Sequence, residues 1–182
     1  MVKHGFIGDK KLLTDLLAIQ NISEIFNQGM HDLLIRSLTV KQHFVEVDPY
    51  EAGVRAFLNF GHTLSHALEL VHPMLSHGEG VTIGIAFALY VSEQRFNVPL
   101  DLEGYLDYLN AYEYPMPLRY DKMDVYFMSM RHDKKNKNDH IRFVLLKQVG
   151  EPLKVSLSLS EVASYLTEFM QFLTDWRERR CL

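Results

Sequence analysis

Cysteine is almost absent from this chain of 182 residues, and its one thiol, Cys181, lies beside the C-terminus. A single cysteine cannot form an internal disulfide, which fits a protein of a reducing compartment. The sequence also lacks an apolar signal region at its N-terminus. Its longest apolar run, residues 81–91, is too short to cross a bilayer. We therefore expect a soluble, cytoplasmic protein with no membrane partner.

The sequence also lacks a strong excess of either positive or negative charge. The formal net charge is -4, and no extended run of Lys or Arg appears. Nucleic acid is therefore not expected as a partner. The basic cluster at residues 131–137 is short and mixed, which suits a compact phosphate or carboxylate better than a polymer. The length suits one domain, and we expect residues 1–182 to form it.

The apolar residues recur mostly at helical spacing. This pattern predicts helices over residues 9–20, 22–28, 30–47, 53–71, 78–94, 102–112, 121–131 and 160–177. Two runs typical of strands, 141–146 and 153–157, flank a turn around Gly150 and predict a small hairpin. We expect a mainly α fold with several helices and one β-hairpin.

The predicted helix over 78–94 has no charge between Gly80 and Ser92, so it should be buried on nearly every side. Gly80, Gly84 and Ala88 recur every four residues. This strip of small residues would let another helix approach closely.

A polar stripe marks the predicted helix over 53–71. Arg55, Asn59, His62, His66 and Glu69 step by four, three, four and three residues, so in a continuous helix all five would project from one face. Such a stripe is most often a solvated face. Solvated faces consist mainly of Lys, Glu and Arg, however, whereas two His and an Asn need hydrogen-bond partners or a metal. The stripe therefore predicts part of an active site.

The histidines of the stripe have the spacing of metal ligands. His62 and His66 lie one turn apart, and two imidazoles at that spacing can reach one ion. The zincin motif places a Glu directly after its first His; Thr63 stands there, which disfavours a metalloprotease. A catalytic zinc usually has three protein ligands, and His77, beyond a short loop, is the further candidate.

Several motifs together resemble the 3-dehydroquinate synthase family. They follow the family's order along nearly the whole chain: KHG at 3–5, Lys41, DPYE at 48–51, Arg55, LNFGHTLSHALE at 58–69, HGE at 77–79, and DKK at 133–135 leading into FVLL at 143–146. The resemblance is to the family's C-terminal, mainly helical domain. It implies the dehydroquinate synthase-like fold.

The resemblance also implies an activity. The family's enzymes, carbon–oxygen lyases of the shikimate pathway, convert 3-deoxy-D-arabino-heptulosonate 7-phosphate to 3-dehydroquinate and phosphate. They use NAD and a divalent metal, zinc or cobalt. Their NAD is held by an N-terminal α/β domain of similar size, and this sequence has no Gly-rich strand-to-helix turn to bind it. We therefore expect the chain to need a missing NAD-binding half and to be inactive alone.

Roles for individual residues follow from the same resemblance. His62 and His77 would be zinc ligands, and the family's third ligand is a Glu three residues before the position of Lys3, which this chain does not contain. His66 and Glu51 would act in general acid–base catalysis. Contacts with the carboxylate, hydroxyls and phosphate of a phosphorylated sugar acid would come from Lys3, Lys41, Arg55, Asn59, His62 and Lys134. Lys135 is the alternative to Lys134.

Two other interpretations stay open. The first is a related iron- or zinc-dependent polyol dehydrogenase, which has a similar helical domain. Arg55, the Asp-Pro-Tyr-Glu segment and the Asp-Lys-Lys motif favour the synthase, because they suit an anionic substrate and the plain alcohol of a dehydrogenase does not require them. The second is a non-catalytic fragment that acts only by associating with a separately made N-terminal half. A domain cut from its other half would expose apolar surface, so we also expect a homo-oligomer.

Overall fold

The structure is a computed structural model that describes residues 1–19, 29–131 and 139–180. In these residues the helices and strands are α1 (Val2–Gly8), α2 (Lys10–Leu17), α4 (Met30–Val47), the 3₁₀ helix η1 (Val54–Asn59), α5 (His62–Val71), α6 (His77–Phe96), α7 (Leu102–Ala111), the 3₁₀ helix η2 (Tyr120–Lys122), α8 (Met123–Arg131), β1 (His140–Leu146), β2 (Pro152–Ser158) and α9 (Leu159–Arg180). The mainly α fold with one hairpin is confirmed.

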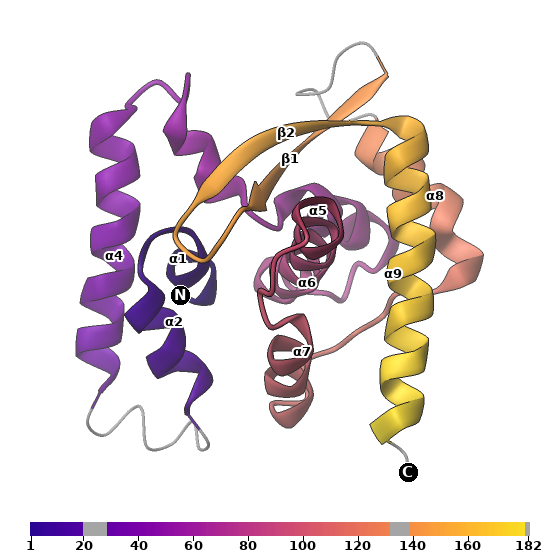
Figure 1. The fold of residues 1–182 in the computed structure, drawn as a ribbon, viewed down its shortest axis with the longest axis horizontal. Coiled ribbons are helices and arrows are strands. Elements are labelled where there is room, and N and C mark those ends of the chain that lie inside the picture. Colours follow the sequence, from indigo (N-terminus) through magenta and orange to yellow (C-terminus); the bar gives the residue numbers. More distant parts are fainter. Residues whose placement is uncertain (20–28, 132–138, 181–182) are drawn as a thin grey trace.

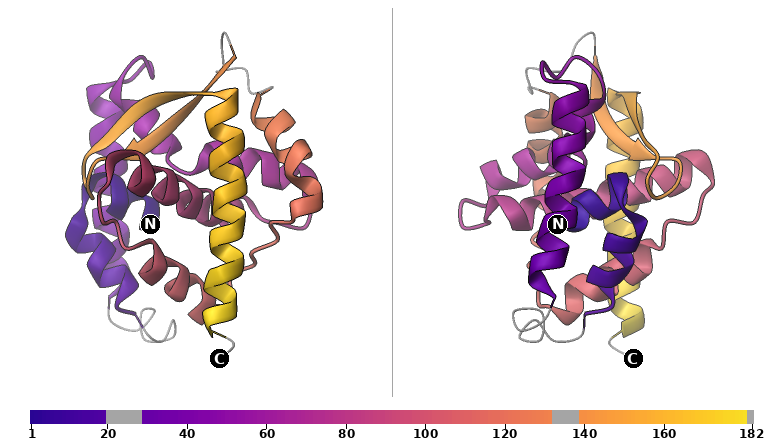
Figure 2. Two further views of the ribbon diagram at one scale, coloured as in Figure 1. Left: turned by 45° about the vertical axis from the view of Figure 1, so that its right-hand side comes forward. Right: turned by 90° about the vertical axis from the view of Figure 1, so that its left-hand side faces the viewer.

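Two central helices organise the molecule. Helices α5 and α6 lie between α4 on one side and α9 on the other, and the β1–β2 hairpin passes over them (Figure 1). Seen from the α4 side, α9 lies at the back (Figure 2, right). Within the described part of the chain, no helix is both long and apolar enough to cross a membrane.

Helix α6 forms the centre of the core, as its charge-free sequence predicts. Twelve of its residues are buried, from Gly80 to Ser92 with one exception. It begins at His77, where the side chain of Ser76 accepts a hydrogen bond from the backbone N–H of Glu79, and the carboxylate of Glu79 accepts one from the backbone N–H of Ser76. This capping box satisfies N–H groups that a helix start otherwise leaves unpaired. Glu79 therefore has a structural task.

Most helix limits agree with the sequence pattern to within a few residues. Helix α4 spans 30–47 as predicted, and its C-terminal residue is followed by Asp48, whose carboxylate accepts hydrogen bonds from the backbone N–H groups of Ala52, Gly53 and Arg55. Helix α2 is shorter than the predicted 9–20 and ends at Leu17. Helix α1 was not predicted, because two glycines interrupt its short apolar pattern. The predicted helix over 22–28 and Cys181 lie outside the described residues.

The predicted continuous helix over 53–71 is wrong. The segment consists of η1 and α5, separated by Phe60 and Gly61. Gly61 has a φ of +83°, in the left-handed region that only glycine enters without strain, so the chain changes direction there. Arg55 and Asn59 are therefore not on the same helical face as His62, His66 and Glu69.

The hairpin pairs its two strands antiparallel, with His140 opposite Ser158 and Leu146 opposite Pro152. Among the hydrogen bonds that attach it to helices, three reach α1, α6 and α5. The N–H of Gly150 donates to Phe6 O at 2.8 Å, that of Leu146 donates to Ser92 Oγ at 3.0 Å, and Thr63 Oγ1 donates to Arg142 O at 3.1 Å. These bonds fix the hairpin to α1, α6 and α5. They therefore determine which hairpin side chains face α5.

Candidate active site

A pocket of about 340 Å³ lies between the η1–α5 segment and the hairpin. Four of the predicted site residues line it: Glu51, Asn59, His62 and His66. The structure therefore brings candidates from both sides of the break at Gly61 into one pocket. The pocket's other lining residues are Ala52, Ala56, Thr63, Arg142, Phe143, Val144 and Lys154.

The rings of His62 and His66, which line this pocket, lie close to the ring of His77, which does not line it. The ring centroids of His62 and His77 are 5.2 Å apart, those of His62 and His66 are 5.8 Å apart, and those of His66 and His77 are 6.4 Å apart. His77 comes from the first turn of α6, whereas the other two belong to α5. The close packing of these two helices therefore places His77 beside His62.

The two predicted metal ligands are oriented through their Nδ1 atoms. His77 Nδ1 lies 2.9 Å from Glu69 Oε1, and His62 Nδ1 lies 3.2 Å from the backbone oxygen of Phe60. Metal-binding histidines characteristically engage one ring nitrogen with a carboxylate or a backbone carbonyl, which directs the other nitrogen to the ion. Both side chains are arranged in this way.

Glu69 also accepts a hydrogen bond from Ser65 Oγ at 2.6 Å on the same oxygen that contacts His77. Burial raises the pKa of Glu69, but the hydrogen bonds from Ser65 and His77 outweigh it, and the pKa is lower than its ordinary value. The carboxylate is therefore charged and fixed. The sequence places Glu69 in the polar stripe but does not reveal this orienting contact.

His62 is held neutral by its surroundings. Burial first, and then the positive charge of Lys3, lower the pKa of His62 to about 4. A neutral imidazole is the form that binds a metal. Among the described residues, no group of three or more His, Cys, Asp or Glu side chains could hold a metal ion. The assignment of His62 and His77 as metal ligands stays a prediction.

Lys3 and Lys41 come from α1 and α4 and lie near enough to influence each other. Burial, followed by the charge of Lys41, lowers the pKa of Lys3 to about 8. Lys3 in turn acts on His62. Neither lysine is among the residues that line the pocket, so their contact with substrate remains a prediction.

The remaining candidates differ in position. Asn59 Nδ2 donates to Glu51 Oε1 at 2.9 Å, which joins two pocket residues. Arg55 does not line the pocket, and its guanidinium donates to the backbone oxygen of Pro49 at 2.6 Å. Lys134, with the rest of the Asp-Lys-Lys motif, lies outside the described residues.

Arg142 and Lys154 are pocket residues that the sequence analysis missed. Both belong to the hairpin, which was treated only as a structural element. The available signal was the strand alternation, which places alternate side chains on one face, but the sequence does not say what that face covers.

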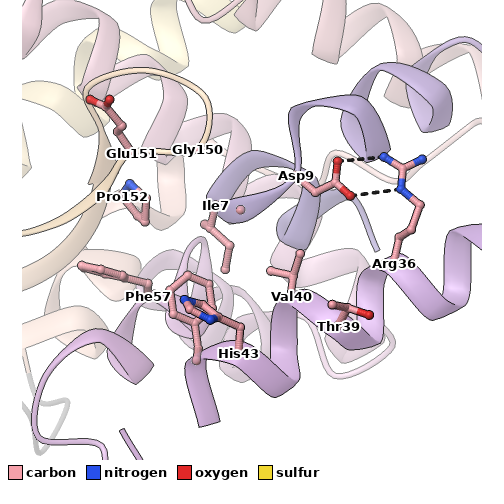
Figure 3. A pocket seen from close by; sticks show the side chains of 12 residues that line it. Ile7, Asp9, Arg36, Thr39, Val40, His43, Phe57, Gly150, Glu151 and Pro152 are labelled. Carbon is pink, nitrogen blue, oxygen red and sulfur yellow. Dashed lines mark hydrogen bonds and ion pairs between the residues drawn. The ribbon is translucent and has the colours of Figure 1, made fainter. Parts of the chain in front are cut away.

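A larger pocket, of about 750 Å³, lies between α1, α4 and the hairpin turn (Figure 3). It contains none of the predicted site residues. Asp9 and Arg36 pair with each other on its wall, with Oδ1 2.7 Å from Nη2, and much of the rest is apolar, including Ile7, Val40 and Phe57. The predicted site residues therefore do not line the larger of these two pockets.

Residues 1–136 match the family described as 3-dehydroquinate synthase C-terminal. The chain belongs to this family. The 3-dehydroquinate synthase of Bacillus pumilus (strain SAFR-032) is 33% identical to it over 185 residues, which cover 100% of this chain and 49% of that protein. That of Oceanobacillus iheyensis is 36% identical over 174 residues, covering 94% of this chain and 48% of that protein. The chain thus spans about half the length of these curated relatives.

Solved structures share the fold. A 2-epi-5-epi-valiolone synthase from Streptomyces hygroscopicus subsp. jinggangensis 5008, with NAD+ and Zn2+ bound, superposes with a TM-score of 0.76 at 20% identity, covering 93% of this chain and 49% of that one. A 2-deoxy-scyllo-inosose synthase complexed with carbaglucose-6-phosphate, NAD+ and Co2+ gives 0.64 at 22% identity, covering 92% and 52%. These similarities confirm the dehydroquinate synthase-like fold.

Proposed function

We propose that the chain is the metal- and substrate-binding half of a 3-dehydroquinate synthase, which converts 3-deoxy-D-arabino-heptulosonate 7-phosphate to 3-dehydroquinate and phosphate. The observation that carries the proposal is one pocket lined by Glu51, Asn59, His62 and His66, with the ring of His77 5.2 Å from that of His62. The chain spans about half the length of these relatives, so the proposed enzyme also includes an NAD-binding half. The chain alone is inactive.

His66 is the proposed proton carrier. It is exposed in the pocket, beside the half-buried His62, and an imidazole can both accept and donate a proton, which suits transfer of a hydroxyl proton in both directions. Glu51 is the second proposed acid–base group. Its hydrogen bond from Asn59 fixes one carboxylate oxygen, while the Asn59 side chain also has the donor and acceptor capacity to bind a sugar hydroxyl.

His62 and His77 would hold the metal, which we propose is zinc. The Nδ1 contacts with Phe60 and Glu69 support this role because they orient both rings. When bound, zinc would polarise and orient substrate hydroxyls. Two imidazoles make an incomplete zinc site, so we expect weak binding to the isolated chain.

The charges around the pocket favour an anionic substrate over the polyol of a related dehydrogenase. Arg142 and Lys154 line the pocket, and Lys3 acts electrostatically on His62. A plain alcohol would not require these cations. Cations near a phosphorylated sugar acid attract it and fix its orientation.

The test is reconstitution. The chain would be fused behind the N-terminal half of the Bacillus pumilus 3-dehydroquinate synthase, and phosphate release would be measured with NAD+, Zn2+ and the heptulosonate phosphate. We expect turnover by the fusion and none by either half alone. A folded fusion that binds NAD+ but releases no phosphate would contradict the proposal, as would turnover by the isolated chain.

Self-association of the isolated chain is a further part of the proposal. Leu34, Ile35 and Leu38 on α4 are 43%, 48% and 60% exposed, and together they form an apolar surface. Such surfaces commonly bind another protein surface. Light scattering should give at least a dimer, and replacing Leu38 by Glu should reduce the mass; a monomeric wild type at all concentrations would contradict this.

A further inference from the structure

One face of the β1–β2 hairpin carries two cations towards the pocket of the proposed active site. Arg142 pairs with Ser156 and Val144 pairs with Lys154. Paired residues of an antiparallel ladder share a face, and residues two apart on one strand do so as well. Arg142 and Lys154 therefore lie diagonally on the same face, and both line the pocket that contains His62 and His66.

The hairpin holds these cations on a rigid support. Thr63 lies directly after His62 in α5, and its Oγ1 donates to the backbone oxygen of Arg142 at 3.1 Å. The bond of Leu146 N–H to the buried Ser92 Oγ fixes the end of β1 to α6. Cations presented by strands that are anchored in this way keep a defined position above the imidazoles, unlike those of a loose loop.

Lys154 has a charge that is available for a ligand. In the part of the chain that the structure describes, its ammonium group makes no hydrogen bond or ion pair. An exposed lysine on an edge strand often serves only to prevent pairing with other strands. Lys154 differs from such a residue in position, because it shares a pocket with Asn59, His62 and His66.

We propose that Lys154, with Arg142 beside it, binds an oxyanion end of the substrate. The group is a phosphate monoester or a carboxylate, and its binding orients the sugar chain between the hairpin and the imidazoles of α5. This inference rests on the proposed function, since it names a contact for the same substrate class. It adds a binding residue from the hairpin to those that the family resemblance assigns.

The first experiment measures binding by the whole isolated chain. Amide NMR titrations would use 6-phosphogluconate, which has both anionic ends, glucose 6-phosphate, which has only the phosphate, and gluconate, which has only the carboxylate. We expect Lys154→Gln to weaken 6-phosphogluconate about tenfold, as loss of one charge-assisted hydrogen bond implies. Whichever single-ended probe shows the same loss identifies the bound group.

Lys147→Gln is the matched control. It removes the same charge from the same hairpin, but Lys147 does not line the pocket. Wild type and K147Q should bind alike. Equal weakening of binding in both variants would mean that only the net charge of the protein matters, and would overturn the inference. Unchanged binding in K154Q, or no binding by the wild type, would also overturn it.

A second experiment separates this inference from the proposed function. In the fusion with an NAD-binding half, K154Q should raise KM for the heptulosonate phosphate about tenfold, whereas K147Q should not. Turnover with an unchanged KM in K154Q would overturn the role of Lys154 and leave the synthase assignment intact. No turnover in any folded fusion, together with selective loss of sugar-phosphate binding in K154Q, would overturn the function but retain an anion site at Lys154.

Discussion

Gly84 in α6 lies directly against the backbone of Gly61, so that a Cβ atom at position 84 would overlap the carbonyl oxygen of Gly61. Gly61 is itself the left-handed residue that ends the η1 segment and allows α5 to begin at His62. This contact determines how closely α6 approaches α5. It therefore fixes the distance between His77 on α6 and His62 on α5.

Replacing Gly84 by Ala should destabilise the protein by about 1–3 kcal/mol, the usual cost of inserting a methyl group into a packed core. Urea denaturation followed by circular dichroism would measure the change. Gly78→Ala is the control in the same helix, because an added Cβ there meets nothing within 4 Å. We expect G78A to be neutral or slightly stabilising. Equal stability of the two variants would show that the α5–α6 contact is looser than described.

Ser92 should contribute as much to the free energy of unfolding as a buried apolar residue. Its buried Oγ donates to Ala88 O at 2.6 Å and accepts from Leu146 N at 3.0 Å. Ser92→Ala leaves the buried N–H of Leu146 without this partner, at a cost of about 1–3 kcal/mol. Ser164→Ala, at an exposed position of α9, should change the free energy of unfolding by less than about 0.5 kcal/mol. Similar losses from both would contradict the anchoring role of Ser92.

The protein should lose stability on mild acidification. Burial, together with the charges of Lys3, the N-terminus and Lys41, lowers the pKa of His4 to about 4, and its Nδ1 lies 2.7 Å from Ser37 Oγ. In the unfolded chain the ordinary pKa is 6.5. The unfolded state therefore takes up the proton first. The contribution of neutral His4 is fully present above pH 6.5 and is lost as the pH falls towards 4, by at most about 3 kcal/mol.

His4→Gln should flatten this part of the stability curve. Urea midpoints measured from pH 7 to pH 4 would fall less steeply in H4Q than in the wild type. His62, whose pKa is also lowered to about 4, would account for part of the slope that remains. Parallel curves for H4Q and wild type would mean that His4 does not resist protonation in the folded protein.

Glu69 should affect metal binding although it is not a predicted ligand. Glu69→Gln removes the charge that faces His77 Nδ1, and loss of such a partner typically costs 10–100-fold in metal affinity. Glu168→Gln is a close control, because Glu168 also accepts a hydrogen bond from a serine four residues earlier, Ser164, but lies on α9. Calorimetric titration with Zn2+ should show weaker binding in E69Q and no change in E168Q. Equal affinities would contradict the orienting role.

The fold was largely predictable because its helices follow local rules. Asp9 and Ser76 both cap helices, and the charge-free run from 81 to 91 is buried in α6 except at Thr82. The continuous helix over 53–71 failed for a tertiary reason. Periodicity continues through Gly61, but the approach of α6 at Gly84 holds that glycine in a left-handed conformation which local pattern cannot reveal.

The site could be predicted only in part for the same reason. His62 and His66 are one turn apart, so their proximity follows from the sequence. His77 lies beside them because α6 packs against α5, which the sequence does not reveal. Likewise, Lys154 lies at the pocket because of where the hairpin is anchored to the helices. Family motifs supplied the predicted roles of Glu51 and Asn59, which their side chains alone would not have specified.

Dehydroquinate formation by the fusion protein with His66→Ala tests the account most directly. The control is His31→Ala, which changes an exposed histidine of α4 outside the pocket. Loss of a general acid–base group typically lowers kcat 10²–10⁴-fold, so we expect a decrease in this range for H66A and none for H31A. Full activity of H66A in a folded, NAD+-binding fusion would contradict the assignment of this pocket as the active site.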